Sequence, residues 1–132
     1  MKEVIKNGKV LARHILKEDI QEGLNFYSKD EEFIQVGAWS YPKDKELLAH
    51  VHNEVERKIN RTYEALYIIQ GSLEAEIYDL EEKPVEKLLI QKGDILILLE
   101  SGHGYHILED NTKVLEIKNG PYLGAEIDRH RI

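Results

Sequence analysis

The chain has 132 residues, of which 42% are hydrophobic and 33% charged, and its net charge is −7. This composition is typical of one globular domain, and the length suffices for one hydrophobic core. The negative charge excludes the broad basic surface that non-specific nucleic-acid binding requires, and the absence of cysteine excludes disulfides and thiolate metal sites.

After residue 30 helical periodicity is weak, and short β-type runs separated by turn residues dominate. The pattern leaves 15–23 open between a helix and an irregular segment. In chain order we expect a short first strand ending at the Asn7-Gly8 turn, followed by strands over 9–14, 33–41, 47–52, 63–69, 73–78, 85–90, 95–99, 105–108 and 114–117. About eight to ten regularly spaced strands, almost without helices, predict an all-β sandwich or small barrel in a single domain.

His50 and His52 flank Val51 in the stretch AHVHN. On a strand, alternate side chains project from the same face roughly 6 to 7 Å apart, so both imidazoles can reach one ion. Without cysteine, a metal would be held by imidazole and carboxylate, which favours iron, manganese, nickel, copper or zinc. An H-x-H pair alone is weak evidence, and two ordinary polar residues on a strand face are the alternative.

Two later stretches strengthen the metal hypothesis. In EALYIIQG, Glu64 is followed by six residues and then Gly71, and GDILILLESGHGYH joins a Gly-Asp turn, an apolar strand, a glycine corner and His103. In this order and spacing the chain resembles the cupin superfamily from about residue 33 to 118. The resemblance implies a small single-domain cupin over 1–132, with a double-stranded β-helix, or jelly-roll barrel, and flanking strands in 1–32.

The resemblance also implies a divalent transition metal (Fe, Mn, Ni or Zn) inside the barrel, held by His50, His52, Glu64 and His103. Two departures leave alternatives open. Eleven residues separate His52 from Glu64, a longer gap than the family usually has, and Glu56 stands at the more usual distance. The second motif lacks the usual proline, and His106 is the alternative to His103. The opposite strand parity of His106 favours a position outside the barrel or a contact with one of the ligands instead of the metal.

Four further residues are candidates for substrate chemistry. For an isomerisation, the candidates for moving the proton are Tyr63, Glu56 and, if it is not fully committed to the metal ion, Glu64. Arg57 and Arg61 lie in the long loop before Glu64, where they are expected to lean over a barrel mouth and clamp a carboxylate or phosphate. The alternative is a solvated charge run. Tyr105 is a candidate substrate contact.

The residues and the resemblance leave three functions open. The first is a metal-dependent enzyme acting on a small polar or acidic molecule, such as a sugar isomerase or epimerase. The others are an Fe(II) dioxygenase of the cupin type and a non-enzymatic small-ligand-binding cupin. A homodimer is expected on family grounds, with 9–14 as an edge strand for swapping. Trp39 is expected in the core, and His14 and His130 on the surface.

The longest apolar run, 95–99, is far below the roughly 18 residues that a membrane span needs. The N-terminal stretch MKEVIKNGKVLARHILKED is charged throughout and lacks the apolar centre of a signal peptide. We therefore expect a cytoplasmic protein with neither membrane nor nucleic acid as a partner.

Overall fold

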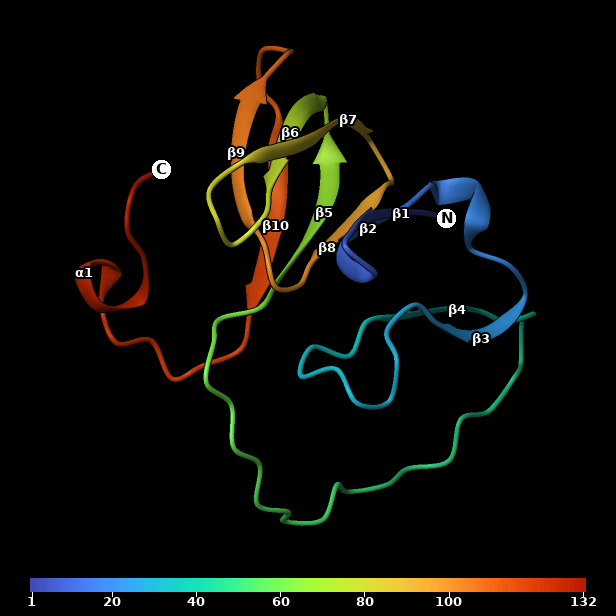
Figure 1. Cartoon of the computed structure of the whole chain (residues 1–132). Helices are drawn as coiled ribbons and strands as arrows, with labels where there is room; N and C mark the ends of the chain where they lie inside the picture. The colour runs from blue at the N-terminus through green and yellow to red at the C-terminus, as the bar shows by residue number, and fades with distance from the viewer.

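The computed structural model describes residues 1–132 as three antiparallel sheets (Figure 1). The five-stranded sheet has the order β1 (Lys2–Lys6), β2 (Lys9–Ile15), β8 (Ile95–Leu98), β5 (Glu64–Gln70), β10 (Lys113–Lys118). The three-stranded sheet has the order β7 (Pro84–Gln91), β6 (Ser72–Tyr78), β9 (Gly102–Ile107), and the third sheet pairs β3 (Gly23–Phe26) with β4 (Gly37–Ser40).

Two short helices complete the structure: a 3-10 helix over Lys17–Asp19 and α1 over Ala125–Asp128. Neither helix has the length and apolar character that crossing a membrane requires. Strands hold 44% of the residues and helices 5%, which confirms the all-β class. None of the three sheets closes on itself, so the jelly-roll barrel stays a prediction.

The main core lies between the five-stranded and the three-stranded sheet. Alternate residues of β5 and β6 point into it, among them Leu66, Ile68, Leu73, Ala75 and Ile77, all at most 2% exposed. This alternation follows from the two-residue period of a strand, which sends every second side chain to the same face. Burying each large aliphatic side chain contributes about 1.5–3 kcal/mol, so this layer holds the two sheets together.

A second core covers the opposite face of the five-stranded sheet. Ile34, from the segment between β3 and β4, packs there against Ile97 of β8 and its buried neighbours. Arg13 of β2 is only 1% exposed on this face, and its guanidinium forms two bonds to the Glu32 carboxylate, at 2.6 and 2.8 Å, and one to Glu3 at 2.8 Å. The Arg13–Glu32 pair therefore anchors the segment between β3 and β4 on the sheet.

Several expectations about the N-terminal part are wrong. His14 is 7% exposed rather than on the surface, and its Nε2 lies 2.8 Å from Oδ2 of the buried Asp94. Because β2 pairs with both β1 and β8, the predicted edge strand lies inside the sheet. Trp39 is 60% exposed on β4 rather than in the core, because the two-stranded sheet leaves that face uncovered.

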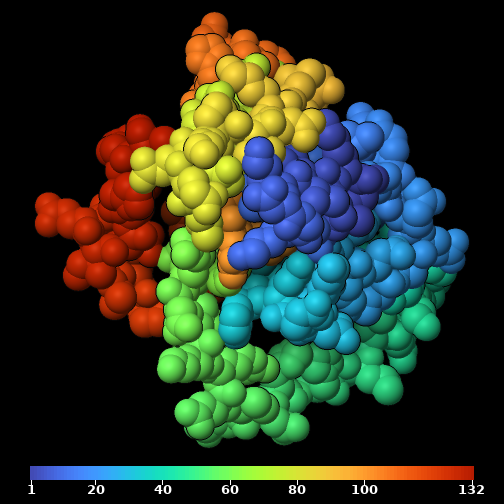
Figure 2. Space-filling view, in the orientation of Figure 1, coloured from blue at the N-terminus to red at the C-terminus, as the bar shows by residue number.

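Residues 41–62 have no helix or strand, so the strand predicted over 47–52 is wrong. This segment runs as a wide arc away from the sheets (Figure 1), and in the space-filling view its green spheres form one rim of the molecule (Figure 2). Pro42 and a turn at Asp44, with φ 67°, follow directly after β4. Beyond the turn no strand pairs with the segment, and an isolated extended segment lacks the backbone hydrogen bonds that make a strand.

Candidate functional site

Polar side chains gather where the two large sheets leave an open side. β9 is an edge of the three-stranded sheet and β10 an edge of the five-stranded sheet. Glu64 of β5 pairs with Lys118 of β10, and it has the strand parity of the core residues Leu66 and Ile68. His103 pairs with the buried Ile77 of β6. These polar residues therefore lie on the core-facing side of both sheets, next to the apolar core and towards the edge strands β9 and β10.

Four of these residues form what we call the polar cluster: Glu64, His103, Tyr105 and Lys118. Glu64 is 5% exposed, and its Oε1 accepts a hydrogen bond from the Tyr105 hydroxyl at 3.0 Å. Its Oε2 lies 3.3 Å from Lys118 Nζ and 3.6 Å from His103 Nε2. Lys118 Nζ also lies 2.6 Å from an oxygen of Glu116. One buried carboxylate thus organises an imidazole, a phenol and an ammonium group.

The other imidazole nitrogen of His103 has no partner. Nδ1 is buried without a hydrogen bond, and so is the hydroxyl oxygen of Ser101 just before β9. Leaving a buried polar atom unpaired costs about 1–3 kcal/mol, and such atoms are rare in folded proteins. Tyr105, whose ring centroid lies 5.2 Å from that of His103, is 38% exposed, so the cluster is reachable from solvent.

The environment fixes the protonation of the cluster at neutral pH. Burial lowers the pKa of His103 and the positive charge of Lys118 lowers it further, while Glu64 opposes the shift, so the imidazole is neutral. Burial and the adjacent Glu64 raise the pKa of Tyr105, which keeps its hydroxyl protonated. The hydrogen bond to Glu116 raises the pKa of Lys118 despite burial, so this group is a cation. A neutral base thus stands beside two proton donors.

The structure brings together two of the four predicted metal ligands, Glu64 and His103. His50 and His52 lie in segment 41–62, where both side chains are exposed and their ring centroids are 5.1 Å apart. No group of three or more histidine, aspartate or glutamate residues is arranged to hold a metal ion. In this arrangement the residues do not fit the metal centre that the sequence predicted.

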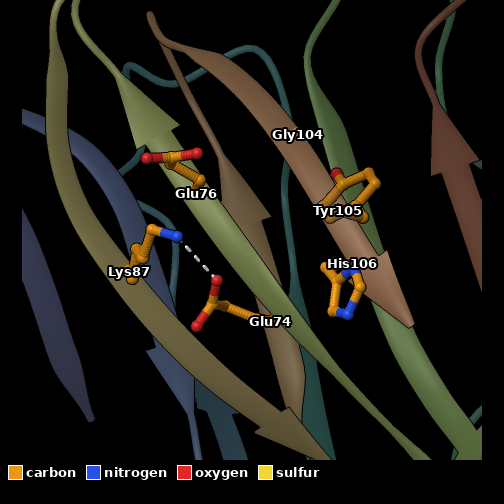
Figure 3. Close-up of a pocket in the computed structure, with 6 residues that line it drawn as sticks. All are labelled: Glu74, Glu76, Lys87, Gly104, Tyr105 and His106. Carbon is orange, nitrogen blue, oxygen red and sulfur yellow. Dashed lines mark hydrogen bonds and ion pairs between the residues drawn. The ribbon is translucent and has the colours of Figure 1, made fainter. Parts of the chain in front are cut away.

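The alternative ligands lie elsewhere. Glu56 is exposed in segment 41–62. His106 pairs with Glu74 and lies on the outer face of the three-stranded sheet, opposite to the core. There it lines a shallow hollow of about 440 Å³ with Glu74, Glu76 and Lys87, whose Nζ lies 2.9 Å from Glu74 (Figure 3). Strand parity separates His106 from His103, as the sequence indicated.

The predicted proton-transfer and anion-binding residues are also dispersed. Tyr63 is 8% exposed in the second core, with its ring centroid 5.8 Å from that of Phe33, so it faces away from the polar cluster. Arg57 and Arg61 are exposed in segment 41–62. Of the predicted substrate contacts, Tyr105 alone belongs to the cluster.

Lys118 and Glu116 were missed by sequence reasoning. Their strand, KVLEIK, exposes Leu115 at 49% and Ile117 at 53%, while the two charged residues take the inward positions that follow Val114. An apolar–polar alternation predicts the reverse, with the apolar residues inside. The signal that could have found them is the i, i+2 spacing of opposite charges on one strand face.

A second hollow adjoins the polar cluster, and we call it the C-terminal cavity. It has a volume of about 440 Å³ and is lined by the end of β10 and the chain that follows: Thr62, Glu116, Lys118, Asn119, Gly120, Pro121, Tyr122, Asp128 and Arg129. Glu116 and Lys118 line it and also contact each other beside Glu64. The cavity and the cluster are therefore parts of one polar region.

Comparison with known proteins gives no match: no family model, no curated protein and no solved structure is similar to this chain. The fold and the polar cluster define an all-β protein of antiparallel sheets with a candidate small-molecule site at the open side between β9 and β10.

Proposed function

We propose that the chain binds a small polar or acidic molecule at the polar cluster and moves a proton on it, as an isomerase or epimerase does. The observation that carries this proposal is the neutral, partly exposed His103 beside Tyr105 and Lys118, with its buried Nδ1 unpaired. Acid–base catalysis needs a base and an acid held within reach of one substrate, in the protonation states that neutral pH provides. The cluster supplies both.

The substrate would have a hydrogen on the carbon next to a carbonyl group. His103 would take the proton from that carbon while the C–H electrons form a carbon–carbon double bond. The carbonyl oxygen would gain the negative charge, which Lys118 and the Tyr105 hydroxyl stabilise by hydrogen bonds. Return of the proton to the other face of the same carbon gives the epimer. Where that carbon carries a hydroxyl, moving the hydroxyl proton to the former carbonyl oxygen and returning the carbon proton to the neighbouring carbon gives the isomer. Glu64, predicted from the sequence to move the proton or to bind a metal, would here orient Tyr105 and stabilise the transient imidazolium.

Exchange of a substrate hydrogen with solvent deuterium tests the proposed proton transfer without knowledge of the natural substrate. Small hydroxy-aldehydes and hydroxy-ketones are incubated with the protein in D₂O, and deuterium uptake beside the carbonyl is followed by NMR. We expect uptake that falls about 10²- to 10⁴-fold in His103→Gln, the usual contribution of a general base. His106→Gln, on the outer face of the same strand, is the matched control and leaves the rate unchanged. Equal rates in both variants contradict the role of His103.

A second candidate function is ligand binding without chemistry. It is favoured by the contacts of Glu64, whose oxygens already engage Tyr105 and Lys118. A carboxylate held in this way organises a binding site without itself accepting a proton. Saturable binding of a small molecule with no deuterium uptake, seen by calorimetry and NMR on the same compound, distinguishes this function from the first.

Metal binding and a cupin barrel remain proposals that rest on the sequence resemblance. They require segment 41–62 to carry His50 and His52 to Glu64 and His103. Elemental analysis of protein purified without added metal tests this, with a His50→Ala, His52→Ala double variant beside the wild type. Stoichiometric Fe, Mn, Ni or Zn that the double variant loses is the expected result, and a wild type that takes up none contradicts it. An iron-bound wild type that consumes oxygen would favour the dioxygenase. The homodimer also remains a proposal, and light scattering of the protein as it elutes from a size-exclusion column tests it by measuring the molar mass.

A further inference from the structure

We propose that Arg129 binds the carboxylate of a small carboxylic acid in the C-terminal cavity. This inference rests on the proposed function and names the substrate class of the same polar region. It gives the anion-binding role that the sequence predicted for Arg57 and Arg61 to a residue near the other end of the chain. Arg129 lines the cavity, whereas Arg57 and Arg61 line neither of the two hollows described above.

Arg129 is the one charged group of the cavity wall that no other side chain engages. Lys118 Nζ lies 3.3 Å from Glu64 and 2.6 Å from Glu116, so two carboxylates already flank its ammonium group and Glu116 is occupied as well. Asp128 accepts a hydrogen bond from the Thr62 hydroxyl. Arg129 has no carboxylate within ion-pair distance and no side-chain hydrogen bond, which leaves its five N–H donors available.

The chain on both sides of Arg129 contacts the body of the molecule. Asp128 is held by Thr62, and His130 Nε2 lies 2.8 Å from an oxygen of Glu82 at the tip of the β6–β7 hairpin. Ile132 packs against Gly102 so closely that a Cβ added to Gly102 would lie 2.6 Å from the Cδ1 atom of Ile132. The backbone N–H of Arg129 donates to Ala125 O at 3.1 Å. The guanidinium therefore starts from a positioned backbone, which lowers the entropy lost on binding.

The charges of the cavity select the kind of anion. A guanidinium presents paired N–H groups that match the two oxygens of one carboxylate. A phosphate dianion needs more than one free cation or a cradle of backbone N–H groups, and here Glu116 and Asp128 add negative charge to the same wall. A singly charged carboxylate is thus the better match. A volume of about 440 Å³ accepts a small molecule whose other end extends towards Lys118 and the polar cluster.

Matched pairs of acid and neutral polyol test the inference on the full chain. Glycerate with glycerol, and gluconate with sorbitol, are titrated into ¹³C,¹⁵N-labelled protein, and the signals of the His103 ring and the Arg129 Nε–H are followed. We expect both acids to shift these signals saturably and to bind at least about tenfold more tightly than their polyols. Arg129→Ala should weaken acid binding about 10- to 100-fold, the usual effect of losing charge-assisted hydrogen bonds.

Arg131→Ala is the matched control, because Arg131 carries the same charge and is exposed like Arg129 but lines neither hollow. It should leave acid binding within about twofold of the wild type. Unfolding curves of both variants verify that each is folded. Acids and polyols that bind equally well, with no loss in Arg129→Ala, overturn the role of Arg129 and leave the proposed site standing.

Two further outcomes also decide the matter. Inorganic phosphate that competes for the same signals and binds more tightly than either acid overturns the carboxylate assignment in favour of phosphate. If neither the acids, the polyols nor phosphate shift the His103 signals, the proposed function and this inference both fail.

Discussion

Replacing Glu32 by glutamine removes the charge that balances the buried Arg13. In the wild type, two guanidinium nitrogens of Arg13 bond the Glu32 carboxylate at 2.6 and 2.8 Å, and the Arg13 side chain is 2% exposed. Hydrogen bonds to charged groups contribute about 1.5–3 kcal/mol each, and breaking a buried ion pair costs about 3–5 kcal/mol. Glu3 still contacts Arg13 at 2.8 Å, and glutamine retains one acceptor. We therefore expect a loss of about 2–3 kcal/mol.

The loss should depend on pH in a defined direction. Burial alone would raise the pKa of Glu32, but the hydrogen bonds from Arg13 and from the backbone N–H of Lys29 outweigh it and hold the pKa below its ordinary value of 4.5. A carboxyl group whose pKa is lower in the folded state stabilises the fold fully above the unfolded value. This contribution disappears as the pH falls through the lower, folded value. The difference between wild type and Glu32→Gln should thus shrink below about pH 4.5.

Urea unfolding at pH 7 and again at several values below pH 4.5 measures both effects, with Glu31→Gln as the control. Glu31 is the exposed neighbour in sequence and has no ion pair, so its replacement should stay within about 0.5 kcal/mol of the wild type. A Glu32→Gln variant as stable as Glu31→Gln at pH 7 would refute the anchoring role of the Arg13–Glu32 pair. So would a loss that stays constant down to pH 3.

Three further substitutions test the packing that supports the site. Ile77→Ala, at a fully buried position that pairs with His103 on the neighbouring strand, should cost about 2–5 kcal/mol in urea unfolding. Gly71→Ala should cost about 1–3 kcal/mol in the same assay, because φ is 77° and the new Cβ would lie 2.9 Å from Thr112 Cα. Asp94→Asn removes a charged acceptor 2.8 Å from His14 Nε2 and should cost about 1–3 kcal/mol, with faster amide exchange in the turn before β8.

The strands of the two large sheets could be predicted because they join local signals to tertiary burial. β5, β6 and β7 each combine alternating apolar residues with a turn marked by glycine or charge, and their bounds lie close to those expected. Gly71, with φ 77°, and Gly93, with φ 93°, occupy turns that an L-residue with a side chain adopts at a cost. Where local sequence signals mark both a strand and its turn, the sequence is sufficient to predict the strand.

Segment 41–62 shows where local pattern fails. Leu47, Leu48, Val51 and Val55 resemble the apolar positions of a strand or helix, yet they are 54–87% exposed. A strand forms only when a neighbouring strand supplies partners for its backbone hydrogen bonds. The local sequence does not indicate which sheet edge is available for this pairing. The metal interpretation of the H-x-H pair depends on a strand at this place. Without it, the predicted shared face of His50 and His52 loses its geometric basis.

The polar cluster could be half predicted for a related reason. Glu64 opens β5 and His103 is the second residue of β9, where Gly102 and Gly104 continue the strand instead of forming the predicted corner. Lys118 stands on a strand whose inward face carries charge. Charged residues at inward positions are stable only where water or a partner reaches them, and the open side between β9 and β10 provides both. The inverted pattern of β10 is therefore a consequence of the unclosed fold. This departure from the usual apolar–polar alternation marks the site in the structure, and it is also the reason why Lys118 could not be predicted from the sequence.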